Sequence, residues 1–284
     1  MTVTTPTTPA GRTDLPHAVP DTPVPDAPGR DAPGRGAPGG LAGAVAAEWT
    51  KLWSVRAPYL CLLAGLAITG VFTYYYASIA RINGHPVQPA GNAAASSAVL
   101  VQFTVVVLAT VAVTSEYATG SVRAALLSVP RRSRVHAAKA LVVAVVAFVA
   151  GAAFAVVGTA VAWFGFDGRA SFSVGLSLRQ VLAIGLYEAL VAVLSVGVAF
   201  ATRHPAGALS ILATLLWALP SILLGLGGPA LAGLNGRLPH GAGERFMRPA
   251  AEAPYGPVTA VLIVAAWAAA AHVIGLYVLR RRDA

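Results

Sequence analysis

The segment TSEYATGSVRAALLSVPRRSRVHAAK, residues 114–139, is a polar interval between two strongly apolar runs, and the rest of the chain is arranged around it. It holds five Lys or Arg residues and one acid, whereas charged residues make up only 11% of the 284-residue chain and hydrophobic residues 56%. A globular domain needs a charged exterior to stay in solution, but a bilayer removes that need over roughly 30 Å of each spanning helix. The composition therefore indicates a membrane protein in which residues 114–139 connect two spans.

Six apolar runs have lengths near the ~20 residues that a helix rising about 1.5 Å per residue needs to cross the hydrocarbon. They are continuously apolar and do not alternate with a period of two residues, which favours helices over a β-barrel. The third run is long for one straight span, so we expect it to tilt or to extend past the membrane. Only residues 203–205 separate the fourth and fifth runs, which predicts a tight helical hairpin. We predict an all-α membrane protein with six transmembrane helices at about residues 58–79, 93–114, 136–166, 181–202, 207–226 and 257–279.

The positions of Lys and Arg predict which ends of the spans face the cytoplasm, where positive charge is retained. If the amino terminus is cytoplasmic, eleven of these residues flank the spans on the inside: Lys51, Arg56, Arg123, Arg131, Arg132, Arg134, Lys139, Arg203, Arg280, Arg281 and Arg282. Six flank the spans on the outside: Arg81, Arg169, Arg179, Arg237, Arg245 and Arg248. We therefore expect a multi-pass protein of the plasma membrane with both termini in the cytoplasm.

Several other classes of protein do not fit the sequence. The net charge of +9 does not indicate nucleic-acid binding, because the basic residues lie between apolar runs and form no stripe on one face. The single cysteine, Cys61, excludes an internal disulfide and a cysteine metal cluster. The sequence has no GxxxxGK[ST] loop for nucleotide phosphates, no HExxH motif and no paired acids. We therefore expect a non-enzymatic chain with no cofactor or metal of its own, which would depend on a second protein for any use of ATP.

Two segments precede the first span. Residues 1–40 are rich in Pro, Gly, Thr and Asp, with DAPGR repeated at 26–30 and 31–35, and we expect them to be a disordered cytoplasmic tail before a transmembrane domain of residues 41–284. Residues 41–56 place apolar side chains at helical spacing, with Glu48, Lys51 and Ser54 on the other side. This pattern predicts an amphipathic helix in the membrane interface or, alternatively, a helix packed on protein. The residues suited to the interface are Trp49, Lys51, Leu52, Trp53 and Arg56.

Residues 120–130 have the pattern of a short amphipathic helix between the second and third spans. Gly120 permits a bend, Ser121 can cap the helix and Pro130 ends it. Arg123 lies on one face, and apolar side chains fall on the other at i, i+3, i+4 and i+7, on Val122, Ala125, Leu126 and Val129. Two interpretations remain open. The apolar stripe rests on the membrane in an ordinary positive-inside loop, or it docks into a groove on a cytoplasmic partner.

Two features nearer the outer side also leave alternatives open. Glu188 lies within the fourth span, where an ionisable group is costly unless it is paired or hydrated, so it is a candidate pathway residue in a functional cavity. The alternative is a carboxyl near the outer interface that is hydrogen bonded to Tyr187 or to a neighbouring helix. The outer loop, residues 227–256, is either a plain loop or contains short helices that dip into the outer leaflet.

The polar interval also carries an ordered set of residues that follows the pattern "E…GT…LL..P..R…K", namely Glu116, Gly120, Ser121, Leu126, Leu127, Pro130, Arg131, Arg134 and Lys139. This order resembles the cytoplasmic loop of type-2 ABC transporter permeases (ABC-2 type), with Ser121 in place of the commoner Thr. The preceding sequence AEWTKLWSVR, residues 47–56, is similar to the amino-terminal helix of the actinobacterial branch of that family.

The resemblance implies a permease subunit that pairs with a second permease subunit, identical or different, and binds separately encoded ATPase subunits that carry ATP and Mg²⁺. In that family the loop between the second and third spans holds a coupling helix that sits in a cleft of the ATPase. The corresponding contact residues are Glu116, Gly120, Ser121, Val122, Arg123, Ala125, Leu126, Val129, Pro130 and Arg131. By analogy we expect an exporter. Two other classes stay open: a proton-coupled secondary carrier, and a non-transporting membrane scaffold or immunity subunit.

Overall fold

The structure of the protein is a computed structural model that describes residues 2, 40–119, 132–248 and 254–281. The chain divides into two units, Met1–Ala37 and Pro38–Ala284. The predicted tail, residues 1–40, lies outside the described residues except for Thr2 and Gly40. The helices and strands that follow all belong to the second unit.

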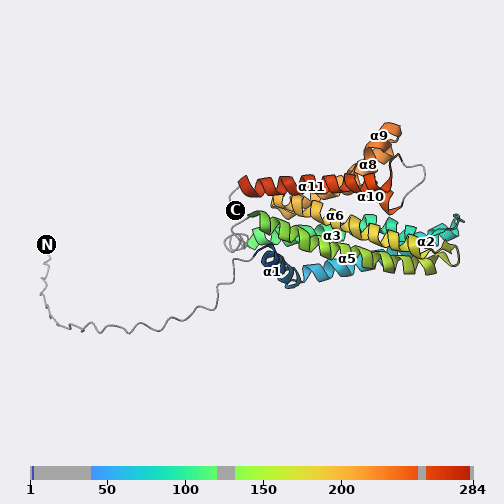
Figure 1. Cartoon of the computed structure of the whole chain (residues 1–284), viewed down its shortest axis with the longest axis horizontal. Helices are drawn as coiled ribbons and strands as arrows, with labels where there is room; N and C mark the ends of the chain where they lie inside the picture. Colours follow the sequence, from blue (N-terminus) through green and yellow to red (C-terminus); the bar gives the residue numbers. More distant parts are fainter. Residues whose placement is uncertain (1, 3–39, 120–131, 249–253, 282–284) are drawn as a thin grey trace. The chain divides into compact units, whose positions relative to one another are not determined.

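Each of the six predicted spans lies within a long apolar helical segment (Figure 1). These segments are α2 (Ala57–Ile82), α3 (Gly91–Thr119), α5 (Arg132–Phe166), α6 (Val174–Thr202), the continuous run of α7 (Pro205–Ala213), η1 (Thr214–Ala218) and α8 (Leu219–Leu226), and α11 (Pro257–Arg281). Among the residues that the structure describes, these six are long and apolar enough to cross a membrane. The prediction of a multi-pass helical membrane protein is therefore confirmed, and at 35 residues α5 is the long span that the sequence indicates.

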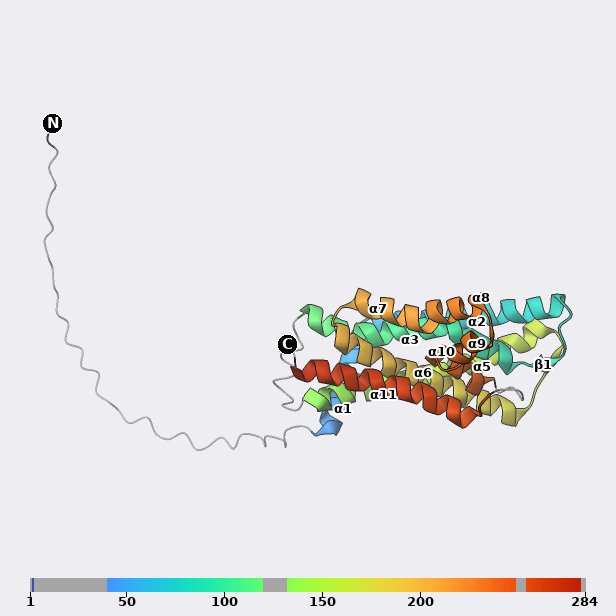
Figure 2. The same ribbon diagram turned by 90° about the horizontal axis from the view of Figure 1, so that it is seen from above.

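α6 is the centre of the bundle, where it packs against α3, α5 and α11. Over the most apolar stretch of each span, 61% of residues are buried in α3 and α6 and 50% in α5, against 22% in α2 and in α7–α8 and 17% in α11. Three spans thus form the interior, and the other three present apolar side chains outward. Seen from above, α7 and α11 lie along opposite edges of the bundle with α6 between them (Figure 2).

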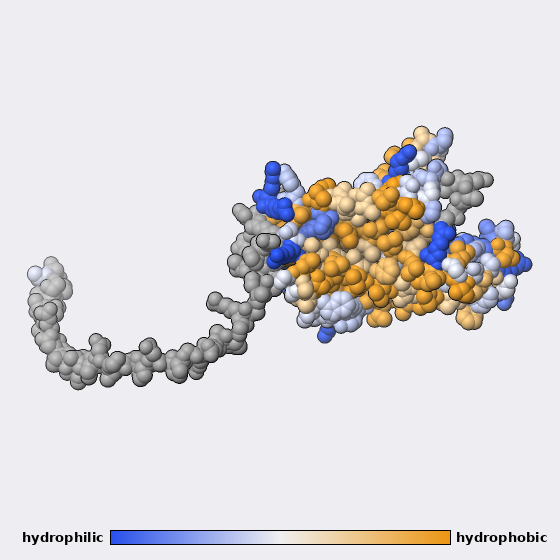
Figure 3. Space-filling model, viewed as in Figure 1, coloured by the Kyte–Doolittle hydropathy of each residue, from blue (hydrophilic) through white to orange (hydrophobic). Residues whose placement is uncertain are grey.

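The outer surface of the bundle is an apolar belt between two hydrophilic ends (Figure 3). Exposed side chains of this belt include Leu63 and Val71 of α2 and Leu262 of α11, each more than half exposed. In water such a continuous apolar surface would be unfavourable, whereas lipid chains solvate it. The belt therefore fits a bilayer, with the charged residues beyond it at each end.

The connection between α6 and α7 is the tight hairpin that the sequence predicts. α6 ends at Thr202, Arg203 adopts the left-handed conformation with φ 57°, and α7 begins at Pro205. Farther along the same span, η1 is a π-helical segment that comes just before Pro220. Because Pro220 has no N–H to donate to a carbonyl one turn earlier, a wider turn accommodates the proline without ending the span.

Short elements lie at the end of the bundle away from α1, which we call the α10 end. α9 (Pro229–Asn235) and α10 (Pro239–Met247) follow α8, so the open question about residues 227–256 is answered in favour of short helices. α10 packs against α6 and α11, with Phe246 meeting Tyr187 of α6 edge to face at 6.2 Å between ring centroids. At the same end, β1 (Gln88–Pro89) pairs in parallel with β2 (Ala170–Ser171).

The first helix, α1 (Leu41–Trp53), differs from the prediction in the face that it buries. The apolar spacing placed Glu48 on the outward side, but Glu48 is only 6% exposed, while Leu41 and Trp49 are nearly half exposed. The reason is that α1 packs on α5, where a buried lysine attracts the carboxylate of Glu48. The face of α1 that carries Glu48 therefore packs on protein, which was the alternative in the sequence analysis. A membrane contact of the opposite face stays a prediction.

α6 and α11 approach so closely that their backbones touch at two glycines. A Cβ atom on Gly197 of α6 would lie 2.5 Å from the carbonyl oxygen of Ala271 and 2.6 Å from the backbone nitrogen of His272. A Cβ on Gly275 of α11 would lie 2.5 Å from the carbonyl oxygen of Gly197. Small residues permit such contacts between membrane helices, where close van der Waals packing drives association.

We expect Gly197→Ala to lower the free energy of unfolding by about 1–3 kcal/mol, because the added methyl group must push α11 away from α6. Gly70→Ala in α2 is the matched control, since a Cβ there meets nothing within 4 Å. The control should be neutral or slightly stabilising, because Ala is the better helix former. Thermal unfolding in detergent, followed by circular dichroism, measures both. Equal melting temperatures for the two variants would contradict the close contact.

Candidate functional site

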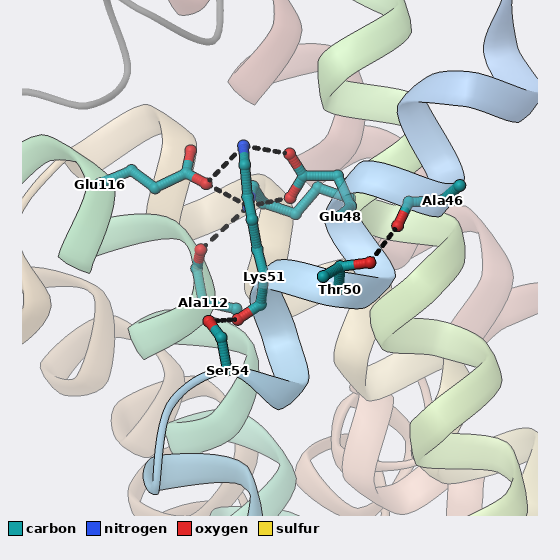
Figure 4. A network of polar contacts seen from close by, with 8 residues as sticks. Ala46, Glu48, Thr50, Lys51, Ser54, Ala112 and Glu116 are labelled. Carbon is teal, nitrogen blue, oxygen red and sulfur yellow. Dashed lines mark hydrogen bonds and ion pairs between the residues drawn. The ribbon is translucent and has the colours of Figure 1, made fainter.

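Four charged side chains meet where α1, α3 and α5 come together (Figure 4). Lys139 of α5 donates hydrogen bonds to Glu48 of α1, to Oε1 of Glu116 on α3 at 3.0 Å and to the carbonyl oxygen of Ala112 at 3.1 Å. Lys51 of α1 donates to Oε1 of Glu48 at 2.8 Å and to Oε1 of Glu116 at 3.2 Å. We call Glu48, Lys51, Glu116 and Lys139 the ion cluster. It joins three helices that are separated in the sequence.

The members of the ion cluster are buried to different degrees. The side chains of Lys139, Glu48 and Glu116 are 4%, 6% and 11% exposed, whereas that of Lys51 is 45% exposed. Two lysines and two glutamates balance in charge when all are ionised. The three buried members hold most of the energy of the cluster, because a buried ion that loses its partner keeps its full desolvation cost.

The environment favours the ionised forms of the two members on α1. Burial raises the pKa of the Glu48 carboxyl, but attraction to Lys139 and hydrogen bonds from Lys139 and Lys51 outweigh this effect, so the pKa is lowered from its usual value. Burial lowers the pKa of the Lys51 ammonium, but the hydrogen bond to Glu48 and attraction to both carboxylates outweigh it, so that pKa is raised. Both shifts keep the charges that hold α1 in place.

An apolar groove of about 360 Å³ adjoins the ion cluster between α1, α2, α3 and α5. Its lining includes Leu52, Pro58, Leu108 and Val142 together with the ion cluster itself. Each charged group of the ion cluster has a partner of opposite sign. The arrangement is therefore suited to fastening α1 to the ends of α3 and α5 beside an apolar surface.

Of the residues predicted to lie in the membrane interface, some contact other helices and others are exposed at the surface. Lys51 directs its ammonium group at two carboxylates of the ion cluster, and Leu52 is buried in the core beside α3 and α5. Trp49 is 46% exposed and meets the half-buried Trp53 edge to face, with 5.8 Å between ring centroids. Arg56 is exposed at the start of α2. The sequence pattern thus identified the helix but not which of its side chains face protein.

The predicted contact residues of the coupling helix are described only at their base. Glu116 lies in the ion cluster three residues before the end of α3, and Lys139 lies near the start of α5. The other contact residues lie outside the described residues: Gly120, Ser121, Val122, Arg123, Ala125, Leu126, Val129, Pro130 and Arg131.

Sequence reasoning did not identify Glu48 or Lys139 as partners in a site, although two signals were present. Glu48 is the only acid between residues 32 and 115. The chain has only two lysines against 18 arginines, and both lysines, Lys51 and Lys139, are in the ion cluster. An ammonium group is a compact charge with three donors, so the single Lys139 can bond both carboxylates and a backbone carbonyl. The rarity of lysine in this chain marks the site.

Glu188, the candidate pathway residue, lies in the interior of α6. It is fully buried, and a Cβ on Gly151 of α5 would lie 2.8 Å from its Cγ. Neither carboxyl oxygen has a hydrogen-bond partner among the described residues, so the expected bond to Tyr187 is not formed. Tyr187 instead donates to Oε1 of Gln102 at 2.7 Å. Glu188 does not line the groove beside the ion cluster.

No protein-family model matches the chain, and no curated protein matches it. Within the described ranges, no group of three or more His, Cys, Asp or Glu side chains is placed to hold a metal ion. A proposal for the function therefore rests on the residues of the ion cluster and of the polar interval.

Replacing Lys139 should destabilise the protein far more than replacing Lys51, although each change removes one positive charge. Lys139→Met leaves two buried carboxylates with one half-exposed partner and should cost about 3–5 kcal/mol. Lys51→Met removes a half-exposed charge and should cost about 1 kcal/mol or less. Equilibrium unfolding in mixed micelles measures both variants. Similar losses for the two would show that burial of Lys139 does not set the energy of the ion cluster.

Proposed function

We propose that the chain is the permease subunit of an ATP-driven exporter of the ABC-2 type, in the plasma membrane with both termini in the cytoplasm. In this proposal it pairs with a second permease subunit and binds ATPase subunits on separate chains, which supply ATP and Mg²⁺. The six apolar helices support a membrane subunit. The motif in the polar interval, residues 114–139, supports membership of that permease family. The ion cluster supports a mechanical role for the interval, because it includes Glu116 and Lys139.

The observation that carries the proposal is that the two ends of the family-like motif are paired. Glu116 is its first residue and Lys139 its last, and their charged groups are 3.0 Å apart although 23 residues separate them in the sequence. The pair joins the end of α3 to the start of α5, so the segment between them is held at a fixed base.

In the proposed mechanism the ion cluster transmits force. ATP draws the partner ATPase subunits together, and the helix of residues 122–129, docked in their cleft, is displaced. Because Glu48, Glu116 and Lys139 bind α1, α3 and α5 to one another, these helices move as one body and do not absorb the displacement locally. The apolar groove beside the ion cluster lies along this moving base.

The double substitution Leu126→Asp with Arg123→Glu should abolish copurification of the ATPase subunit, because it places charge in the apolar stripe and reverses the charge opposite it. The matched control is Phe172→Asp with Arg169→Glu, which makes the same two changes at exposed residues of the α10 end. The measurement is affinity copurification with a coexpressed candidate ATPase subunit that binds the unmodified chain, together with ATP turnover of the purified complex. Normal binding and turnover in the first variant would remove the proposal.

The buried carboxyl of Glu188 favours a second candidate function, a proton-coupled carrier. A carrier would need this carboxyl to take up and release a proton, so Glu188→Gln should abolish proton-driven transport in vesicles. In an ATP-driven permease the same isosteric change should leave ATP-dependent transport within about twofold of the unmodified protein, because neither carboxyl oxygen has a hydrogen-bond partner among the described residues. Transport driven by a proton gradient in the absence of any ATPase would favour the carrier.

A further inference from the structure

A polar basin of about 610 Å³ lies at the α10 end, between the starts of α3 and α6 and the short helices α9 and α10. Its polar lining comes from four elements, with Asn92, Gln180, Asn235, Glu244, Arg245 and Arg248. The basin is larger than the groove beside the ion cluster and, unlike that groove, is lined mainly by polar groups. Neither the membrane spans nor the proposed coupling to an ATPase accounts for it.

Several polar atoms around the basin are buried and have no hydrogen-bond partner among the described residues. Gln180 is 3% exposed, and while its Nε2 donates to Oδ1 of Asn92 at 3.0 Å, its Oε1 is unpartnered. Asn235 is 7% exposed, and its Oδ1 is unpartnered in the same way. One guanidinium nitrogen of Arg245, Nη1, is the third such atom. Buried polar atoms are nearly always bonded to protein or ordered water in native proteins, so these three are open to the complementary groups of a ligand.

The charges of the basin favour an anion. Arg248 donates to Oε1 of Glu244 at 2.6 Å and to Oγ of Ser96 at 2.9 Å, so its charge is largely balanced. The guanidinium of Arg245 instead lies over the ring of Tyr255, 4.6 Å from its centroid. That contact orients the guanidinium without neutralising it. Among the described residues that line the basin, two arginines and one glutamate leave a net positive charge, located on Arg245.

Two glycines make room for the side chains of Gln180 and Arg245. A Cβ on Gly236 would lie 2.5 Å from Cζ of Arg245, and a Cβ on Gly91 would overlap Oε1 of Gln180. Any other residue at either position would therefore displace one of the unpartnered groups. Glycine is the residue that permits such close approach of a side chain to the backbone.

We propose that the basin binds a hydroxylated anion, a phosphate or carboxylate that carries hydroxyl groups. Arg245 binds the anionic oxygen through its Nη1 group and its charge, and the side-chain carbonyl oxygens of Gln180 and Asn235 accept hydrogen bonds from the hydroxyls. The volume of the basin exceeds what a bare phosphate fills, which leaves room for the hydroxylated part. The same chemistry occurs in a polyol phosphate in solution and in the headgroup of a lipid such as phosphatidylglycerol. The site does not depend on how transport is driven.

The test uses the full chain in nanodiscs of phosphatidylcholine. Glycerol 3-phosphate is titrated calorimetrically, and binding of phosphatidylglycerol added to the discs is followed by native mass spectrometry. Arg245→Met should weaken binding at least about tenfold, because a charge-assisted hydrogen bond is lost. Arg179→Met is the matched control, since it removes an exposed arginine of the same end that does not line the basin. It should leave the affinity unchanged.

A second variant keeps the test decisive if Arg245→Met does not fold. Gln180→Glu has nearly the same size and places a negative charge in the basin, so it should also weaken binding at least about tenfold. Binding of both probes supports a site open to soluble ligands, and binding of phosphatidylglycerol alone supports the same chemistry with lipid as its source. The proposal is overturned if neither probe binds, or if inorganic phosphate or phosphocholine binds as tightly as the probes. It is also overturned if Arg179→Met weakens binding as much as Arg245→Met does, or if Gln180→Glu folds and binds normally.

Discussion

The constraint on which the bundle depends is the burial of a lysine between two carboxylates. An ammonium group with only 4% of its side chain exposed is tolerated because Glu48 and Glu116 surround it and a backbone carbonyl accepts its third hydrogen bond. Each partner comes from a different helix, so none of the three helices can move away without breaking an ion pair of a buried charge. Apolar packing between membrane helices is less directional than this. The ion cluster fixes which parts of α1, α3 and α5 meet, and the apolar contacts follow.

The spans could be predicted from the sequence because a bilayer imposes one strong requirement on length and apolarity. All six predicted spans lie within observed helices, and the hairpin at residues 203–205 was evident from its charge and proline. The buried face of α1 could not be predicted in the same way. A helical wheel assigns charged residues to the outside, and Glu48 is inside only because Lys139, 91 residues later, is its partner. Contacts of this kind are set by tertiary structure, which a local pattern does not contain.

The two ends of the bundle use polar groups differently. In the ion cluster at the α1 end each charge has a partner of opposite sign, and the pairs hold helices together. At the α10 end, Gln180, Asn235 and Arg245 keep buried polar atoms without partners among the described residues, and glycines preserve the space around them. No local pattern predicts the second arrangement, because amides and glycines are common and their meeting depends on how α9 and α10 fold back on the bundle. Polar groups that pair with one another stabilise the bundle, whereas buried polar groups without partners are candidates for ligand recognition.

The length of α5 has a consequence for where the ion cluster sits in the membrane. Its 35 residues span about 52 Å, well beyond the ~30 Å of hydrocarbon, and Lys139 lies about 10 Å from the start of the helix at Arg132. A centred helix therefore holds Lys139 at the level of the lipid headgroups, where water and phosphates lower the cost of a charge. A thicker bilayer would place the ion cluster, with its half-exposed Lys51, at the depth of the acyl chains. The stability of the cluster, and of the three helices that it joins, is thus tied to the thickness of the membrane around them.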